Sequence, residues 1–369
     1  MLGLLNLHNS PEIGPLTADR PMATLSFLGR YAIMDFALSN FVNSEIDQIG
    51  IMIANHQRSV NKHLGSRNTF NVNTKTGFEA LMYNEDAQGG NARYNHEFGN
   101  IRNNFYIFEK TNADYIVFAP AHFITTIDYR DVLKAHIESE AEITLVYAEV
   151  DNAKSHYIGS SIVSINDDGR VVGFTENKGA DDEAKISLEI YIINRDKLME
   201  MMTKAAKISS FFGLHDYISY TCNRREYVHS YKYEGYLCTI DSGENYVKSS
   251  LDLLNYRERK LLFKPDWPIY TVTHDTPPAQ YSEKADVQNA FVANGSYIEG
   301  QVINSIISRN VSIGEGAHIE NSIIFSGAKI GKNVTLKNAI VDKRAVVTKT
   351  KVLIGEPESP VYIGQGDQV

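Results

Sequence analysis

The chain has 369 residues, of which 43% are hydrophobic and 22% charged, and its formal net charge is -9. This composition is typical of a globular protein with room for two packed domains, and it excludes a disordered chain. The acidic balance provides no cluster of Lys and Arg, so we exclude nucleic acid as a partner. The chain also lacks an apolar run of roughly 18 residues and the charged start of a signal peptide, and we expect a cytoplasmic protein without membrane contact. Its two cysteines are far apart, which predicts free thiols.

The first 241 residues have the pattern of an α/β layered fold, because short apolar runs alternate with amphipathic stretches. Apolar runs predict buried strands, and Asp167-Asp168-Gly169 predicts the turn of a hairpin. The expected strands are residues 48–54 and 115–121, the expected helices are residues 100–112 and 129–138, and the hairpin covers residues 161–176.

A change of fold is expected after a helical stretch at residues 244–262. This stretch ends before Pro265 and Pro268, and prolines of this spacing stop a helix. We therefore predict an N-terminal domain at 1–245, a helical linker at 246–280 and a second domain at 281–369.

Small aliphatic residues recur every six positions in the second domain, with one slip of a single residue. A six-residue repeat with one inward aliphatic side chain per rung is typical of a left-handed parallel β-helix, which usually serves assembly. A β-sandwich is the weaker alternative. The first row is Val311, Ala317, Ile323, Ala328, Val334, Ile340 and Val346, and the second row is Ile313, Ile319, Ile330 and Leu336.

Four short motifs occur in the order in which one enzyme family has them. They are Pro15 to Arg20 (PLTADR), Ala32 to Asn40 (AIMDFALSN), Glu234 to Tyr236 (EGY) and Thr276 to Ala279 (TPPA). Through them the chain resembles the glucose-1-phosphate adenylyltransferases, the ADP-glucose pyrophosphorylases of glycogen and starch synthesis. The resemblance covers nearly the whole chain. It implies a Rossmann-like nucleotidyltransferase domain followed by a left-handed parallel β-helix.

The phosphate-binding loop departs from the family pattern. The family binds triphosphate on a loop of the form GGxGTRLxPLT, whose glycines let phosphate approach backbone amides. Residues 7–14 lack this glycine pattern, and Glu12 stands where the family has a phosphate-binding Arg. Met22 replaces a Lys that contacts phosphate, whereas Arg20 is kept. Arg20 belongs either to a remnant of the substrate pocket or to a structural ion pair.

The carboxylates that hold Mg²⁺ in the family are also missing. The first metal-binding Asp falls on His122 or on Ala121, depending on the alignment, and the second falls on Thr239. Asp241 would point the same way as Thr239 on a strand, about 7 Å further along. Magnesium prefers oxygen ligands, so His122 is a poor replacement. We expect no metal or other cofactor in this chain.

The sugar-phosphate site is partly kept. The family's FxEKP becomes Phe174 to Gly179, in which Glu176 is shared and Lys178 follows one position late. A bulge would return the Lys178 ammonium to a phosphate. Glu189 replaces a glycine and adds bulk and negative charge to the pocket floor. The candidate residues of a vestigial substrate pocket are Arg20, Glu176 and Lys178.

Four elements of one mechanism are thus changed while the scaffold motifs are kept. Electrostatic and metal assistance commonly supply several kcal/mol each, so their loss predicts a catalytically impaired chain. The pattern resembles the GlgD-type regulatory subunits of Gram-positive glycogen synthesis, which implies a heterotetramer with a GlgC-type catalytic subunit, or a homo-oligomer when alone. The catalytic positions of the family are lost at Glu12, Met22, His122 and Thr239.

The family also has a cationic effector site between its two domains. Its GKFR element corresponds to residues 29–32, where Arg30 keeps the charge of the effector-binding Lys. Lys343 resembles part of a late DKN segment, although charged residues on β-helix turns are ordinarily just solvated. Arg30 and Lys343 are the candidate contacts for a sugar-phosphate effector.

Two other functions stay open. The chain would be a weakly active pyrophosphorylase if Asp241 rebuilt the metal site, which requires metal-dependent turnover by the chain alone. A hexapeptide-repeat acyltransferase would need a catalytic His on the solenoid, and His318 is the only candidate. That function would leave the N-terminal domain unexplained.

Overall fold

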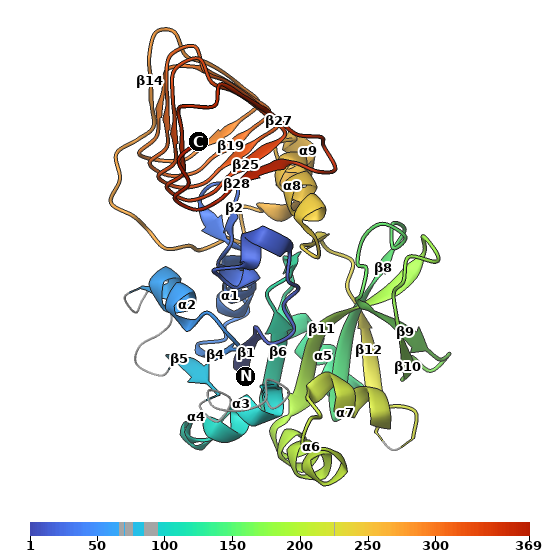
Figure 1. Ribbon diagram of the computed structural model, residues 1–369. Helices are drawn as coiled ribbons and strands as arrows, with labels where there is room; N and C mark the ends of the chain where they lie inside the picture. Colours follow the sequence, from blue (N-terminus) through green and yellow to red (C-terminus); the bar gives the residue numbers. More distant parts are fainter. Residues whose placement is uncertain (66–69, 71–76, 85–94, 225) are drawn as a thin grey trace.

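The computed structural model describes residues 1–65, 70, 77–84, 95–224 and 226–369, and it has an N-terminal α/β domain below a C-terminal β-helix (Figure 1). The largest sheet among the described residues of the N-terminal domain is mixed, and its strands are β1 (Leu2–Asn6), β4 (Gln48–Ile53), β5 (Phe78–Tyr83), β6 (Tyr115–Pro120), β8 (Ile143–Val150), β9 (Ser161–Ile165), β10 (Val171–Glu176), β11 (Ala184–Asn194) and β12 (Val228–Lys232). The order is β10-β9-β11-β6-β1-β4-β5, and β8 pairs with β11 and β12. Strand β1 is parallel to β4 and β6, whereas β11 is antiparallel to β6 and β8.

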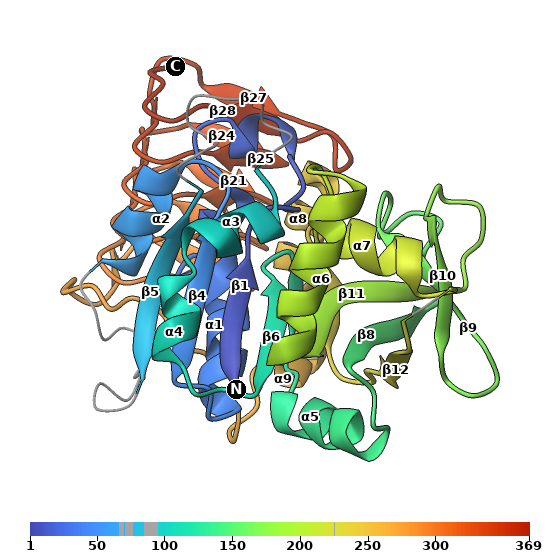
Figure 2. The same ribbon diagram turned by 90° about the horizontal axis from the view of Figure 1, so that it is seen from below.

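Helices cover both faces of this sheet. One face packs against α1 (Ile33–Asn43), α2 (Gln57–Leu64) and α5 (Tyr129–Glu138), and the other against α3 (Glu97–Asn103), α4 (Tyr106–Lys110), α6 (Arg195–Ile208) and α7 (Leu214–Thr221) (Figure 2). Side chains alternate along β1, so Leu2 and Leu4 join the hydrophobic cluster with Phe98 while Leu5 joins the cluster with Phe41. Within the described ranges, none of the helices has the length and apolar content that a membrane span needs.

Most of the elements predicted for this domain are confirmed. Strands β4 and β6, helix α5 and the hairpin of β9 and β10 lie where the sequence predicts them, and Gly169 in the hairpin turn has φ +74°. The single helix predicted at residues 100–112 is wrong, because α3 ends at Asn103 and α4 begins at Tyr106. Between them, the Asn104 side-chain amide donates to the carbonyl oxygen of Tyr83 on β5 (2.7 Å), which ties the break to the sheet.

The connection to the second domain contains two helices, α8 (Gly243–Asp252) and α9 (Tyr256–Leu262), in place of the single helix predicted at residues 244–262. The Asn255 side chain accepts a hydrogen bond from the Arg257 amide (2.9 Å) and starts α9. The exact domain boundaries stay a prediction. The short elements near the connection are η1 (Gly14–Thr17), η2 (Met22–Thr24), β2 (Ser26–Phe27), β3 (Tyr31–Ala32), β7 (Phe123–Thr125) and β13 (Leu237–Thr239).

The predicted parallel β-helix is confirmed. Each coil contributes one strand to each of three parallel sheets, which form a triangular prism (Figure 1). The first sheet contains β14 (Gln280–Tyr281), β17 (Tyr297–Ile298), β20 (Ser312–Ile313), β23 (Lys329–Ile330) and β26 (Val346–Val347). The second contains β15 (Asp286–Gln288), β18 (Gln301–Ile303), β21 (His318–Glu320), β24 (Thr335–Lys337) and β27 (Val352–Ile354). The third contains β16 (Phe291–Val292), β19 (Ile306–Ile307), β22 (Ile323–Ile324), β25 (Ala339–Val341) and β28 (Val361–Ile363).

Three positions of the predicted first row do not point into the solenoid. Val346 is only half-buried, because its neighbours Ala345 and Val347 fill the interior instead. Ile323 and Ile340 are buried, but they belong to the hydrophobic cluster between the domains and not to the interior of the prism. Side chains alternate along a strand, so an apolar residue that directly adjoins an inward one points outward.

These outward residues attach the β-helix to the N-terminal domain. Ile306, Ile323 and Ile340 occupy paired positions on three successive coils and share a cluster with side chains of α1 and α8. The hairpin of β2 and β3 approaches the same face through Gly29, which has φ +71°; a Cβ there would lie 3.0 Å from the Ile307 carbonyl oxygen. The two domains therefore share one continuous hydrophobic contact.

Candidate functional site

Three backbone amides of the loop that follows β1 are not free to bind a phosphate. The amides of Leu7, His8 and Ile13 already donate to acceptors within the protein, at distances of 3.1, 3.0 and 2.9 Å. Glu12 is exposed at the surface of this loop. These three donors are therefore not available to the phosphate cradle that the place of the loop in the chain implies.

A pocket of about 470 Å³ lies beside this loop, and we call it the acidic pocket. Its lining includes four carboxylates, and none of the described residues that line it is Lys or Arg. A phosphorylated ligand would therefore meet like charge. The four carboxylates are those of Glu97, Glu176, Glu189 and Asp216.

Glu176 lines the acidic pocket, whereas Lys178 lies outside that lining. The Lys178 ammonium is 3.8 Å from a Glu176 carboxylate oxygen, and both side chains are largely exposed. Between them, the buried Asn177 donates its side-chain amide to the carbonyl oxygens of Ala153 (2.8 Å) and Tyr157 (3.0 Å). The structure thus brings Glu176 and Lys178 together as a surface pair, and Asn177 holds the segment away from a phosphate-binding arrangement.

Glu189 stands in a bulge of β11, where the register with β8 shifts, and has φ +53°. Burial, and the nearby carboxylate of Glu97, raise the pKa of the Glu189 carboxyl to about 7. The side chain is therefore partly protonated at neutral pH. It adds bulk to the pocket, but less negative charge than the sequence predicts.

The positions that would hold Mg²⁺ do not provide suitable ligands. His122 is 3% exposed, and burial lowers its pKa to about 4, so the imidazole is neutral at pH 7. Across the described ranges, neither His122 Nδ1 nor Thr239 Oγ1 has a hydrogen-bond partner, and no group of three or more His, Cys, Asp or Glu side chains is placed to hold a metal. Magnesium needs several oxygen ligands, which this arrangement lacks.

Asp241, the residue that would rebuild the metal site, is engaged in structural hydrogen bonds. One carboxylate oxygen accepts from the Tyr157 amide (2.7 Å) and the other from the Asn245 side-chain amide (2.5 Å). Tyr157 is buried, and its ring stacks on Phe123 with the centroids 6.3 Å apart. Asp241 therefore joins the loop that carries Tyr157 to α8, and both of its oxygens are occupied.

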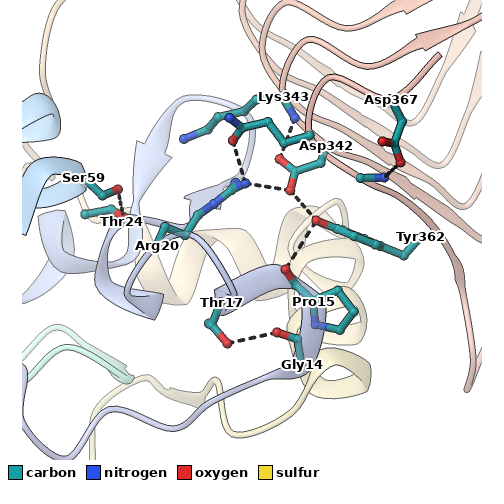
Figure 3. Close-up of polar contacts among 12 residues, drawn as sticks. Gly14, Pro15, Thr17, Arg20, Thr24, Ser59, Asp342, Lys343, Tyr362 and Asp367 are labelled. Atoms are coloured by element: carbon teal, nitrogen blue, oxygen red, sulfur yellow. Dashed lines mark hydrogen bonds and ion pairs between the residues drawn. The ribbon is translucent and has the colours of Figure 1, made fainter. Parts of the chain in front are cut away.

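Arg20 lies against the β-helix and not in the acidic pocket (Figure 3). Its guanidinium forms an ion pair with Asp342 (2.7 Å) and a hydrogen bond with Gln365 (3.1 Å), and the Tyr362 hydroxyl also donates to Asp342 (2.6 Å). Arg20 is 4% exposed and Asp342 is fully buried. Of the two alternatives from the sequence, the structural ion pair is observed. Met22, which replaces the family's Lys, is buried in the hydrophobic cluster between the domains.

A second pocket of about 470 Å³ lies between the domains, and we call it the interdomain pocket. Arg30 lines it, as does Arg259 of α9 and Arg309 of the β-helix. In the part of the chain that the structure describes, none of these three side chains forms an ion pair with a carboxylate. The pocket therefore has a net positive charge that an anion would offset.

Neighbouring groups position the guanidinium groups of Arg309 and Arg259 in the interdomain pocket. Its guanidinium donates to the carbonyl oxygen of Val272 (3.2 Å), and burial together with the nearby Arg30 lowers the pKa of Arg309. The Arg259 guanidinium lies over the ring of Phe291, 5.3 Å from its centroid. Neither Arg259 nor Arg309 was predicted. Only Arg309 has a signal in the sequence, its position shortly after Ile306 of the outward row, which becomes visible once the coils are in register. Arg259 lies on α9 and has no such signal.

Lys343 does not join Arg30, since it lies outside the lining of the interdomain pocket. It follows Asp342 at the Arg20 ion pair (Figure 3), and burial and the nearby Arg20 lower the pKa of its ammonium to about 8. His318 stands on the second sheet of the β-helix, where its imidazole bonds to Gln301 (2.7 Å).

Comparison with known proteins identifies relatives of both domains. Residues 12–236 match the family described as "Nucleotidyl transferase", and residues 277–359 match "GlmU-like, C-terminal hexapeptide". The chain is 30% identical to "Glycogen biosynthesis protein GlgD" of Bacillus subtilis (strain 168), over 99% of this chain and 96% of that protein. It is 26% identical to "Glucose-1-phosphate adenylyltransferase" of Thermosipho melanesiensis, over 84% of this chain and 75% of that protein.

Proposed function

Since the chain belongs to the glucose-1-phosphate adenylyltransferase family, we propose that it is a regulatory, catalytically impaired subunit of this enzyme in glycogen biosynthesis. The acidic pocket carries the proposal. Nucleotidyl transfer needs phosphate-binding amides, cations and a metal to offset developing charge. Here three loop amides are already bonded, the pocket carries carboxylates, and the metal positions are His122 and Thr239.

The expected partner is a catalytic homologue of the same family. This chain shares its two-domain scaffold with such homologues, so we propose a mixed tetramer, with a homo-oligomer as the alternative in the absence of the partner. The name of the Bacillus subtilis relative supports a role in glycogen biosynthesis. We place the complex in the cytoplasm, and we propose that this chain itself binds no Mg²⁺.

The interdomain pocket is the proposed effector site. It joins elements of both domains and α9, so an anion bound to Arg30, Arg259 and Arg309 would favour one arrangement of the domains over another. A sugar phosphate is the expected ligand. Lys343 is proposed only as a neighbouring contact, because it lies at the Arg20 ion pair.

The test measures ADP-glucose formation from ATP and glucose-1-phosphate, first with this chain alone and then with this chain titrated into a limiting amount of the catalytic homologue. We expect no turnover by the chain alone and a saturable change in the rate or effector response of the homologue. Metal-dependent turnover by the chain alone, abolished by Asp241→Asn, would instead support a weakly active pyrophosphorylase. Unchanged kinetics of the homologue would contradict the regulatory function.

A further inference from the structure

Glu97 is the most deeply buried carboxylate of the acidic pocket, and both of its oxygens bond within the protein. The residue is 3% exposed. Oε1 accepts from the side-chain amides of Asn6 (2.9 Å) and Asn9 (3.0 Å), and Oε2 accepts from the backbone amide of Leu214 (3.3 Å). Asn6 and Asn9 belong to the end of β1 and the following loop, and Leu214 begins α7. One carboxylate thus joins two elements that are distant in the sequence.

The donors that Glu97 occupies are of the kind that bind phosphate. Free amides at the start of a helix carry a partial positive charge, and they bind anions in many nucleotide sites. The side-chain amides of Asn6 and Asn9 extend this donor set onto the loop after β1. In the present arrangement all three donors point at an anionic group, and that group belongs to the protein itself.

The surroundings of Glu97 keep it ionised. Burial alone would raise the pKa of its carboxyl, but the hydrogen bonds from Asn6 and Leu214 act in the opposite direction, and the pKa lies below its ordinary value. The backbone is also adapted to it: a Cβ on Gly213 would lie 2.4 Å from Glu97 Oε2, so this contact requires a glycine there.

We infer that Glu97 is an internal substitute for an anionic ligand, which holds the loop after β1 and the start of α7 together and occupies the donors that a phosphate would need. This inference concerns the pocket invoked in the proposed function, but it does not depend on any partner subunit. It predicts a cleft that stays in one arrangement without nucleotide, and a phosphate site that appears when the carboxylate is removed.

Two variants test the contact in different ways, and a third is the control. Glu97→Ala removes the carboxylate. Gly213→Ala keeps Glu97 but displaces it, and the backbone of Gly213 (φ -84°, ψ -173°) accepts alanine. Asp216→Asn removes an exposed charge that caps the same helix through the Gly213 amide (3.0 Å), without touching the loop after β1. The measurement is hydrogen exchange of residues 6–14 and 213–221, with and without pyrophosphate.

Exchange in both segments should rise roughly ten- to a hundredfold in Glu97→Ala and Gly213→Ala, which is the range expected for lost hydrogen bonds to a charged group. Pyrophosphate should reduce the exchange of these two segments in Glu97→Ala, and it should not reduce their exchange in the wild type or in Asp216→Asn. Protection of these segments by pyrophosphate in the wild type as strong as in Glu97→Ala, or unchanged exchange in Gly213→Ala, would overturn the inference. If Glu97→Ala does not fold, the exchange rates measured in Gly213→Ala test the inference instead.

The outcome is separate from that of the proposed function. Protection of residues 6–14 and 213–221 by pyrophosphate, in a wild type that forms no ADP-glucose, would contradict only the role of Glu97. Turnover by the wild type alone would contradict the proposed function, whatever the exchange data show.

Discussion

Replacement of Arg20 by Met should destabilise the protein strongly, because it leaves a buried carboxylate without its counter-ion. Arg20 is 4% exposed and Asp342 is fully buried. Removal of one partner from a buried ion pair costs about 3–5 kcal/mol. Asp342 would keep hydrogen bonds from the Tyr362 hydroxyl and the Lys343 amide, so we expect the lower end of this range, about 3 kcal/mol.

The assay is urea unfolding followed by circular dichroism and by the fluorescence of Trp267, the single tryptophan. Two further variants make the result interpretable. Arg20→Met with Asp342→Asn removes both charges and should be less destabilised than the sum of the single changes. Arg344→Met alters an exposed residue on the same turn and should change the free energy of unfolding by less than about 0.5 kcal/mol.

A cost below about 1 kcal/mol for Arg20→Met, or a double variant whose cost equals the sum, would refute the assignment of Arg20 to a structural pair. Such a result would mean that the Arg20–Asp342 contact contributes little to the stability of the fold.

Three other changes have defined outcomes. Arg309→Met should weaken sugar-phosphate binding in the interdomain pocket about tenfold, as measured by calorimetry, because hydrogen bonds to charged groups contribute about 1.5–3 kcal/mol each. The control is Lys349→Met, which changes an exposed cation outside this pocket. Glu189→Gln should stabilise the protein at pH 8 more than at pH 5. The folded wild type keeps a proton on this carboxyl up to about pH 7, whereas the unfolded carboxyl loses its proton near pH 4.3, so the stability of the wild type falls as the pH rises between about 4.3 and 7. Equal effects at both pH values in urea unfolding would contradict this. Val347→Ala should cost about 2 kcal/mol and Val346→Ala less than half as much, and the reverse order in thermal unfolding would mean that the register of the last coil is wrong.

The strand pattern of the β-helix could be predicted from the sequence because its signal is local. Each coil repeats the same spacing of aliphatic residues, and most of the predicted positions face the interior. The direction of Ile323 and Ile340 could not be predicted, because an isoleucine that packs inside the solenoid and one that packs against another domain look the same in a sequence. The break at Asn104 depends on a carbonyl of β5, which is a tertiary contact.

The candidate site divides in the same way. Losses such as Glu12 and Met22 are visible by position within a motif. The partners that decide what the remaining side chains do come from distant segments: Asp342 fixes the role of Arg20, and Arg309 completes the pocket of Arg30. Such pairings carry no local pattern, since they depend on how the β-helix docks on the N-terminal domain.

The outward row of Ile306, Ile323 and Ile340 also limits how this protein can evolve. In most solenoids the gain or loss of a whole coil is a mild change, since each coil contacts only its neighbours. Here the contacts with the N-terminal domain begin near Phe291 and extend to Gln365, so an extra coil between them would move every later contact by about 4.8 Å, the spacing of neighbouring strands. The contact with the N-terminal domain thus fixes the number of coils between Phe291 and Gln365, and we expect duplications and deletions of single coils to be selected against within this span.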